Sequence, residues 1–117
     1  MTYDKKFNLE IKKRVKSFSK NSKLLEVSKK FNIQSALTKY SYNFSWAGVP
    51  VIQLPQDLIC MQELIFKIKP DMIVETGIAR GGSLIFYSSI LSMIKSKYKV
   101  VGIDIDIRAH ARKVLNT

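Results

Sequence analysis

Residues 74–83 of this chain, VETGIARGGS, begin at the end of a short apolar run and decide the expected fold. The run that leads into them, residues 71–75 (DMIVE), has the length of a strand, and three glycines then indicate a tight loop. We expect Ser83 to cap a helix that continues to about Lys97, and a second strand over residues 98–104 (YKVVGID). A strand, a crossover helix and a second strand form a βαβ unit, whose parallel strands are buried in an α/β sheet.

The glycines of this loop and one carboxylate predict a ligand-binding site. Gly77, Gly81 and Gly82 allow the backbone to approach a ligand closely, and the start of the next helix contributes free N–H groups and a partial positive charge. Glu75, at the end of the first strand, suits a cationic group. S-adenosylmethionine carries an ammonium, a carboxylate and a sulfonium, so it matches both properties of the loop.

Three kinds of nucleotide-binding loop compete for this stretch. The glycine spacing does not fit the G-x-G-x-x-G of dinucleotide-binding folds. Gly77 and Gly82 have the separation of a P-loop, but Ser83 stands where that motif needs its phosphate-binding lysine. The pattern acidic-x-G-x-x-x-G, beginning at Glu75, fits without a substitution and resembles motif I of class I methyltransferases.

Asp104 lies at the end of the second expected strand, 22 residues after Gly82. A carboxylate at this place can accept hydrogen bonds from both hydroxyls of a ribose. Asp106 follows two residues later and ranks second for the same role. The alternative is that both carboxylates only cap the next helix.

The segment before the first strand is expected to be structural. Residues 46–55 contain a glycine and two prolines among apolar residues, which indicates an extended connector with Trp46 as its core anchor. Asp57 is then expected to cap a helix that ends at Lys69, with Cys60 as a buried thiol on it. The apolar face of this helix is expected to hold Leu58, Met61, Leu64, Ile65 and Ile68.

The first part of the chain differs from the rest in charge. Residues 1–45 hold eleven Lys and Arg against three acidic residues, whereas residues 46–117 hold nine against six. We expect the first range to be a basic helical appendage, with one helix around residues 9–16 and another that begins near Asn21 or Ser22. Its lysines are interpreted as a solvated face, because no nucleic-acid motif and no aromatic stacking platform accompany them. No secretion signal or membrane span is recognisable, so the expected compartment is the cytoplasm.

Several motifs occur in one order that resembles the cephalosporin hydroxylase / rhamnosyl O-methyltransferase family. They are Trp46-x-Gly48-x-Pro50, Gln53-x-Pro55-x-Asp57-Leu58, Gln62-Glu63-Leu64-Ile65, Lys69-Pro70-Asp71, the stretch from Glu75 to Ser83, and the stretch from Gly102 to Arg108. The resemblance covers about residues 46–112. It implies a Rossmann-like class I methyltransferase fold, S-adenosylmethionine as donor, and transfer to a hydroxyl oxygen.

The resemblance also implies roles for individual residues. The methionine end of the donor would lie against Glu75, Gly77, Gly81, Gly82 and Ser83, and the ribose against Asp104. Arg108, His110 and Arg112 match the stretch after the second strand. Relatives usually read His-Asn-Arg there, whereas alanine stands at position 111 of this chain.

A complete fold of this class has about seven strands, so we expect this chain to hold only its N-terminal half, with the fold incomplete. The magnesium-binding carboxylates and the acceptor pocket of the relatives would then follow Thr117. No metal ligand or catalytic base is therefore assigned here, and the isolated chain is not expected to turn over. Expected partners are a hydroxyl acceptor (a sugar, a lipid-linked sugar or a natural product) and a second copy or a second half-chain. The alternative is a non-catalytic binding module whose basic arm contacts an anionic partner.

Overall fold

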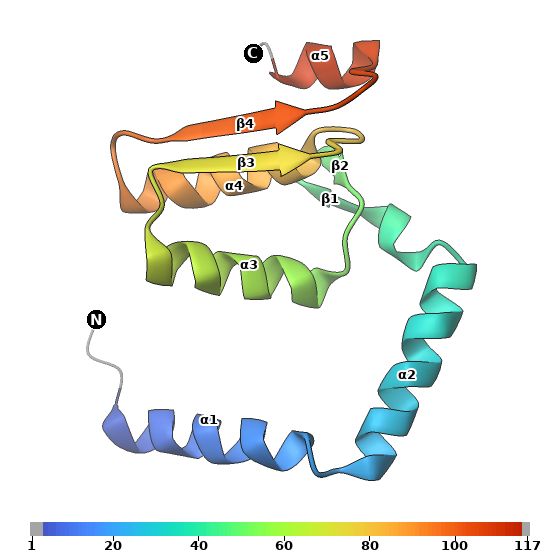
Figure 1. Cartoon of the computed structure of the whole chain (residues 1–117), viewed down its shortest axis with the longest axis vertical. Coiled ribbons are helices and arrows are strands. Elements are labelled where there is room, and N and C mark those ends of the chain that lie inside the picture. Colours follow the sequence, from blue (N-terminus) through green and yellow to red (C-terminus); the bar gives the residue numbers. More distant parts are fainter. Residues whose placement is uncertain (1–3, 116–117) are drawn as a thin grey trace. The chain divides into compact units, whose positions relative to one another are not determined.

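The computed structural model describes residues 4–115 and separates into two units, one that ends at Thr38 and one that begins at Lys39 (Figure 1). The first unit holds α1 (Lys5–Phe18) and α2 (Ser22–Leu37). The second holds, in order, η1 (Tyr40–Asn43), β1 (Phe44–Trp46), β2 (Val49–Val51), α3 (Pro55–Ile68), β3 (Met72–Thr76), α4 (Gly82–Ile94), β4 (Lys99–Ile103) and α5 (Ala109–Leu115). The domain boundary expected from the sequence, between residues 45 and 46, falls inside β1.

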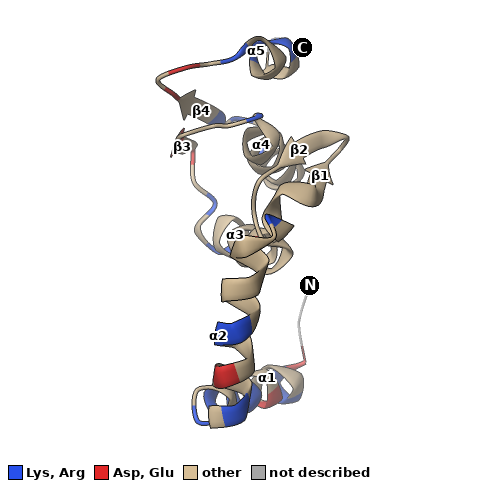
Figure 2. Ribbon diagram, turned by 90° about the vertical axis from the view of Figure 1, so that its right-hand side faces the viewer, with Lys and Arg blue, Asp and Glu red and all other residues tan. Residues whose placement is uncertain are grey.

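The two expected N-terminal helices are present, and both begin at side-chain caps. The Asp4 carboxylate accepts a hydrogen bond from the Lys6 amide at 2.9 Å, and the Asn21 side chain accepts one from the Leu24 amide at 3.0 Å. The cap expected near Asn21 is therefore confirmed. Figure 2 shows basic residues on both helices. Within residues 4–115, every helix is too short or too polar to cross a membrane.

The expected extended connector is instead a β-hairpin. β1 and β2 pair in antiparallel register, and the two residues of the turn, Ala47 and Gly48, both have positive φ, at 49° and 81°. Two left-handed residues give the turn the twist that short hairpins need. Trp46 is the core anchor that the sequence predicted, because its Nε1 donates to Ser89 Oγ at 2.9 Å and its ring packs edge-on against Phe86 at 4.9 Å.

α3 does not begin as predicted. Its first residue is Pro55, whose fixed φ suits a first helical position, and Asp57 lies within the first turn without capping the helix. The predicted end is confirmed, since Lys69 closes the helix in the left-handed conformation with φ 50°. Cys60 is exposed, not buried, because it lies on the side of the helix opposite Leu58 and Ile65.

α3 packs through a narrower stripe than the apolar pattern suggests. Ile65 is buried, and Leu58 and Met61 are partly buried against the same cluster. Leu64 and Ile68 are 49% and 66% exposed, because they lie beside this stripe on the helix surface.

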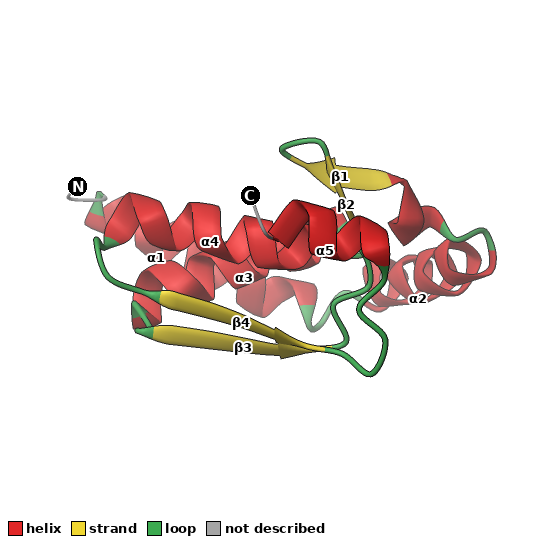
Figure 3. Cartoon of the chain, turned by 90° about the horizontal axis from the view of Figure 1, so that it is seen from above, coloured by secondary structure: helices red, strands yellow, loops and turns green. Residues whose placement is uncertain are grey.

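β3 and β4 form the parallel pair that the βαβ pattern predicted, with Val74 opposite Val101 and Glu75 opposite Gly102. α4 is the crossover helix and ends at Ile94, before the predicted Lys97. α3, α4 and α5 lie on one side of this pair (Figure 3). The opposite side carries exposed apolar side chains, namely Met72, Val74 and Ile103.

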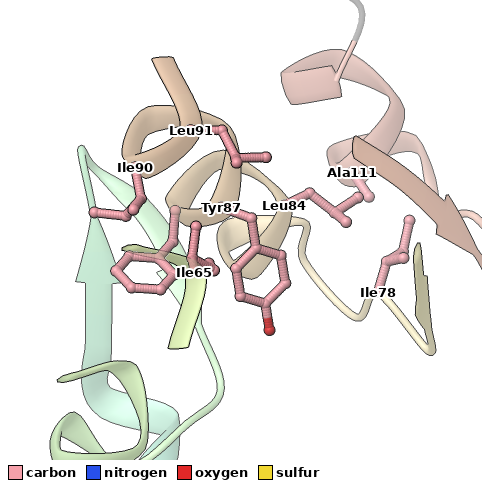
Figure 4. Packing of buried hydrophobic residues seen from close by; sticks show 8 residues of the cluster. Ile65, Ile78, Leu84, Tyr87, Ile90, Leu91 and Ala111 are labelled. Carbon is pink, nitrogen blue, oxygen red and sulfur yellow. The ribbon is translucent and has the colours of Figure 1, made fainter. Parts of the chain in front are cut away.

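The core lies between the helices and the covered face of this sheet. Its buried members are Ile65, Ile78, Leu84, Phe86, Tyr87, Ile90, Leu91 and Ala111 (Figure 4). Tyr87 contributes its ring to this cluster, while its hydroxyl reaches toward polar side chains at the cluster's edge. The core therefore ends next to the glycine loop.

The Lys95 side chain binds three successive residues that lie just before β3. Its ammonium donates to the backbone oxygens of Lys69 and Pro70 at 3.2 and 3.3 Å and also binds the Asp71 carboxylate. The Lys95 hydrogen bond and charge hold the pKa of Asp71 below its usual value. The end of α3 is thereby tied to the end of α4, just before β3 enters the sheet.

Candidate functional site

The glycine loop between β3 and α4 is closed by its own backbone. The Gly77 amide donates to the Ile103 oxygen at 2.8 Å, which continues the pairing of β3 and β4 by one residue. The Gly81 amide donates to the Ile78 oxygen at 2.7 Å and so closes a turn just before the helix. Gly77, Ala79 and Gly81 have φ of 81°, 46° and 86°, a region that side-chain-bearing residues adopt at a cost.

Gly82 allows the hairpin to contact the start of α4. A Cβ atom at this position would lie 2.2 Å from the Pro50 oxygen and 2.9 Å from the Val51 nitrogen. Both atoms belong to the backbone of β2, so a side chain at Gly82 could be accommodated only by displacing this strand. The absence of a side chain at Gly82 therefore brings residues 50–53 next to the glycine loop.

Ser83 does not cap α4, contrary to the sequence prediction. The helix begins at Gly82 with Gly81 as its N-cap, because the left-handed Gly81 has already turned the chain into the helix. The Ser83 hydroxyl, one residue into the helix, instead donates to the Glu75 carboxylate at 2.6 Å. It thereby holds that carboxylate against the helix N-terminus.

Glu75 is a half-buried carboxylate, and its hydrogen bonds offset only part of the cost of burying its charge. Burial raises its pKa above the usual 4.5, and hydrogen bonds from Ser83 and Tyr87 lower it in part. A cationic group next to Glu75 would favour its ionised form. The site therefore suits a positively charged ligand group.

Gln53 adds an acceptor to the site for which no role was expected from the sequence. Its amide nitrogen donates to the Tyr87 hydroxyl at 3.5 Å, and its Oε1 is buried with no hydrogen-bond partner among residues 4–115. A buried acceptor without a donor costs about 1–3 kcal/mol. Tyr87 lies one helical turn after Ser83, so its spacing could have pointed to the site, but no local signal identifies Gln53.

A small cavity of about 90 Å³ lies among these groups. It is lined by Pro50, Ile52, Gln53, Glu75, Gly77, Ile78, Ala79, Arg80, Gly82 and Ser83. The structure thus brings together four of the residues predicted to hold the methionine end, namely Glu75, Gly77, Gly82 and Ser83. Gly81 faces elsewhere, since a Cβ on it would lie 3.6 Å from the Leu115 side chain.

Asp104 connects the loop to the end of β4. Its Oδ2 accepts from the Ile78 amide at 2.8 Å and its Oδ1 from the Asp106 amide at 3.0 Å. These backbone hydrogen bonds, first that of Asp106 and then that of Ile78, lower the pKa of Asp104 below its usual 3.8. The alternative that Asp104 caps the next helix is wrong, because α5 begins only at Ala109 and the carboxylate is bonded elsewhere.

A second, larger cavity of about 410 Å³ adjoins Asp104. Its lining residues are Tyr42, Ile52, Ala79, Arg80, Asp104, Ile105, Asp106, Arg108 and His110. Ile52, Ala79 and Arg80 line both cavities, so the two spaces share a wall. Together they offer a narrow polar end near Glu75 and a wider end near Asp104.

The basic residues after β4 have separate surroundings. Arg112 donates from Nε to the Ile107 oxygen at 2.8 Å, which is a structural contact. Arg108 pairs with Asp106 at 3.4 Å on the surface, and His110 is exposed at the start of α5, where it lines the larger cavity. Between residues 4 and 115, no three His, Cys, Asp or Glu side chains cluster as metal ligands would.

Comparison with known proteins identifies the family. The family model for rhamnosyl O-methyltransferase/CmcI matches residues 38–117. The rhamnosyl O-methyltransferase of Mycobacterium leprae (strain TN) is 28% identical over 61 residues, which are 52% of this chain and 27% of that protein. A solved structure described as "cmcI-N160 SAH" superposes with a TM-score of 0.52 at 25% identity, over 60% of this chain and 39% of the other.

The chain thus spans well under two thirds of the length of either relative. The predicted fold class is confirmed, since β3, α4 and β4 form the βαβ part of a Rossmann-like methyltransferase fold. With a family match over more than half of its residues, this chain belongs to the rhamnosyl O-methyltransferase/CmcI family.

Proposed function

We propose that this chain binds S-adenosylmethionine and supplies the donor site of an O-methyltransferase. The observation that carries the proposal is the pair of adjoining cavities, with Glu75 at the narrow end and Asp104 at the wide end. A nucleoside with an amino-acid tail has the same two ends. The solved relative whose description names SAH supports this assignment.

The residues present fit such a ligand. The Glu75 carboxylate would face the ammonium, and the free amides at the start of α4 would face the tail carboxylate. Asp104 would accept from the ribose hydroxyls while it keeps its bonds to the Ile78 and Asp106 amides. When bound, the donor supplies an electrophilic methyl group on a sulfonium.

For the acceptor we propose a hydroxyl group of a sugar, a lipid-linked sugar or a natural product, because the curated relative is named a rhamnosyl O-methyltransferase. The protein would align this hydroxyl with the methyl group. We assign no catalytic base within this chain. We also propose a cytoplasmic location, where the free thiol of Cys60 would stay reduced, and assembly with a second copy or a second half-chain.

Calorimetric titration of the whole chain with S-adenosylhomocysteine tests the donor site. We expect saturable binding of one ligand per chain, and no comparable binding of a nicotinamide dinucleotide, whose phosphates would need the glycine spacing that this loop lacks. Absence of S-adenosylhomocysteine binding would contradict the proposed function.

One observation favours an additional function for the first unit. Phe7, Ile11, Val15 and Phe18 recur at helical spacing on α1 and are all exposed, while Lys5, Lys6, Lys12, Lys13 and Lys16 occupy the remaining surface. A basic amphipathic helix of this kind is typical of binding to an anionic membrane surface. Nucleic acid would be held by the lysines alone and would leave the apolar row in water.

Co-sedimentation with lipid vesicles tests this second function. The chain should bind vesicles that contain phosphatidylglycerol but not vesicles of phosphatidylcholine alone. A Lys12→Glu, Lys13→Glu variant should bind roughly 10-fold more weakly or worse, since each basic residue near such a surface contributes about 1 kcal/mol. The matched control, Lys97→Glu with Lys113→Glu, changes the net charge equally outside α1. Equal weakening by the control, or equally tight binding to duplex DNA, would contradict a membrane role for α1.

A further inference from the structure

We propose that Gln53 binds the ammonium group at the amino-acid end of the donor, with its Oε1 as the acceptor. The inference rests on the proposed function and adds a residue from the segment between β2 and α3 to the donor site. Its starting point is the buried Oε1 atom, which has no hydrogen-bond partner among residues 4–115. Native structures rarely leave such an acceptor unpaired without a functional reason.

The hydrogen-bond network fixes which end of the Gln53 amide is free. The amide nitrogen of Gln53 donates to the Tyr87 hydroxyl at 3.5 Å, and the amide oxygen is left for another donor. The same hydroxyl lowers the pKa of Glu75, as expected where it directs its proton to that carboxylate and accepts from Gln53.

The other polar groups of the small cavity show which donor would be suitable. Glu75 is an acceptor, and the Ser83 hydroxyl already directs its proton to that carboxylate. Gln53 and Glu75 come from two different segments, both line this cavity, and each carries an acceptor oxygen. An ammonium has three N–H donors and needs several acceptors. A carboxylate or phosphate would instead be repelled by the oxygen atoms of Gln53 and Glu75, since it can itself only accept.

The position of Gln53 is built into the fold. Val51 is 1% exposed, and the close approach of Gly82 to the Pro50 oxygen sets this end of β2 against the start of α4. Pro55 then begins α3 two residues after Gln53. The Gln53 side chain is therefore held between two fixed points.

A purely structural role for Gln53 makes a different prediction. If Gln53 only supports Tyr87, its replacement should affect every ligand of the site to the same extent. If its oxygen binds the ammonium, the effect should depend on whether the ligand carries an amino group. A set of matched ligands separates the two roles.

The experiment titrates the whole chain with three ligands by calorimetry. These are S-adenosylhomocysteine, the same thioether without its α-amino group, and 5′-methylthioadenosine, which lacks the whole amino-acid tail. The variant Gln53→Met keeps the length of the side chain and removes the amide. Gln56→Met makes the same change at an exposed position of α3 and is the matched control.

We expect Gln53→Met to weaken S-adenosylhomocysteine binding about 10-fold or more, since a hydrogen bond to a charged group is lost. Binding of the two ligands without the amino group should change less than about 2-fold, and Gln56→Met should match the wild type for all three. A second variant, Tyr87→Phe, keeps the packed ring but releases the Gln53 amide. Tyr87→Phe should also weaken S-adenosylhomocysteine more than the ligands without the amino group, with a smaller loss of affinity. This variant keeps the test valid if Gln53→Met does not fold.

The outcomes distinguish this inference from the proposed function. If S-adenosylhomocysteine binds but all three ligands weaken equally in both variants, Gln53 is structural and the donor site stands. If the wild type binds the thioether without the amino group as tightly as S-adenosylhomocysteine, the ammonium is not recognised and the inference is overturned. If S-adenosylhomocysteine does not bind at all, both the inference and the proposed function fail.

Discussion

Replacement of Gly82 by alanine is expected to destabilise the unit from Lys39 onward by about 3 kcal/mol, a large effect for one methyl group. The added Cβ would lie 2.2 Å from the Pro50 oxygen and 2.6 Å from the Pro50 carbonyl carbon. Backbone atoms in a paired strand cannot rotate away as a side chain can. Either β2 separates from α4 or the helix start unwinds, and both changes disturb the loop of the donor site.

Urea unfolding followed by the fluorescence of Trp46 measures this effect. Trp46 is the single tryptophan of the chain and packs on α4 through Phe86 and Ser89, so it reports on the contact that the alanine would break. Gly102→Ala is the matched control. Its Cβ would meet Leu84 Cδ1 and Ile78 Cγ2 at 2.5 and 2.6 Å. These are side-chain atoms and not backbone atoms, so we expect a smaller loss of about 1–2 kcal/mol. Equal or reversed effects would show that the hairpin does not contact α4 as described.

Replacement of Asp104 by alanine is expected to weaken S-adenosylhomocysteine binding about 10- to 100-fold. The change removes the carboxylate that we place on the ribose hydroxyls, and hydrogen bonds to charged groups are among the stronger ones. It also releases the Ile78 amide, which Asp104 holds at 2.8 Å, and so loosens the glycine loop. Asp106→Ala, which removes a carboxylate from the same cavity, should have a much smaller effect because Asp106 makes only a surface contact to Arg108.

The ligand series separates this effect from that of Gln53. 5′-Methylthioadenosine retains the ribose, so Asp104→Ala should weaken it as strongly as S-adenosylhomocysteine. Loss of binding for the tailed ligand alone would place Asp104 away from the ribose and contradict the assignment.

Asp104 also gives the stability of the chain a defined pH dependence. Because the backbone amides of Asp106 and Ile78 lower its pKa in the folded state, the carboxylate stabilises the fold above its usual pKa of 3.8. This contribution should disappear as the pH falls below that value and the carboxylate becomes protonated. The difference in unfolding midpoint between the wild type and Asp104→Asn should therefore narrow in acid.

The features predicted correctly from the sequence depend on neighbouring residues. The Asn21 cap, the end of α3 at Lys69 and the βαβ unit around residues 74–83 all follow from local propensity and apolar spacing. Two expected caps, Asp57 and Ser83, were wrong because Pro55 and Gly81 begin their helices earlier by backbone geometry alone. In both cases the prediction looked for a side chain that caps the helix, whereas proline or glycine starts the helix through its backbone conformation.

The features that the sequence missed depend on contacts between distant segments. The packing of β2 against the start of α4 brings Pro50 next to Gly82, 32 residues further on. Gln53 and Tyr87 meet across 34 residues, so no local pattern could connect them. Glu75 and Asp104 were identifiable because each ends a strand in a parallel pair, a position that places side chains at one edge of the sheet.

Lys95 lies at the far end of the sheet from both cavities, yet its contacts bear on which side chain lines the small cavity. Successive residues of a strand point to opposite faces, so a shift of β3 by one position would turn Glu75 outward and bring a neighbour in its place. By binding Lys69, Pro70 and Asp71 together, the Lys95 ammonium opposes such a shift before the strand begins. A lysine remote from the ligand thus helps to keep Glu75 directed into the cavity from the opposite end of the strand.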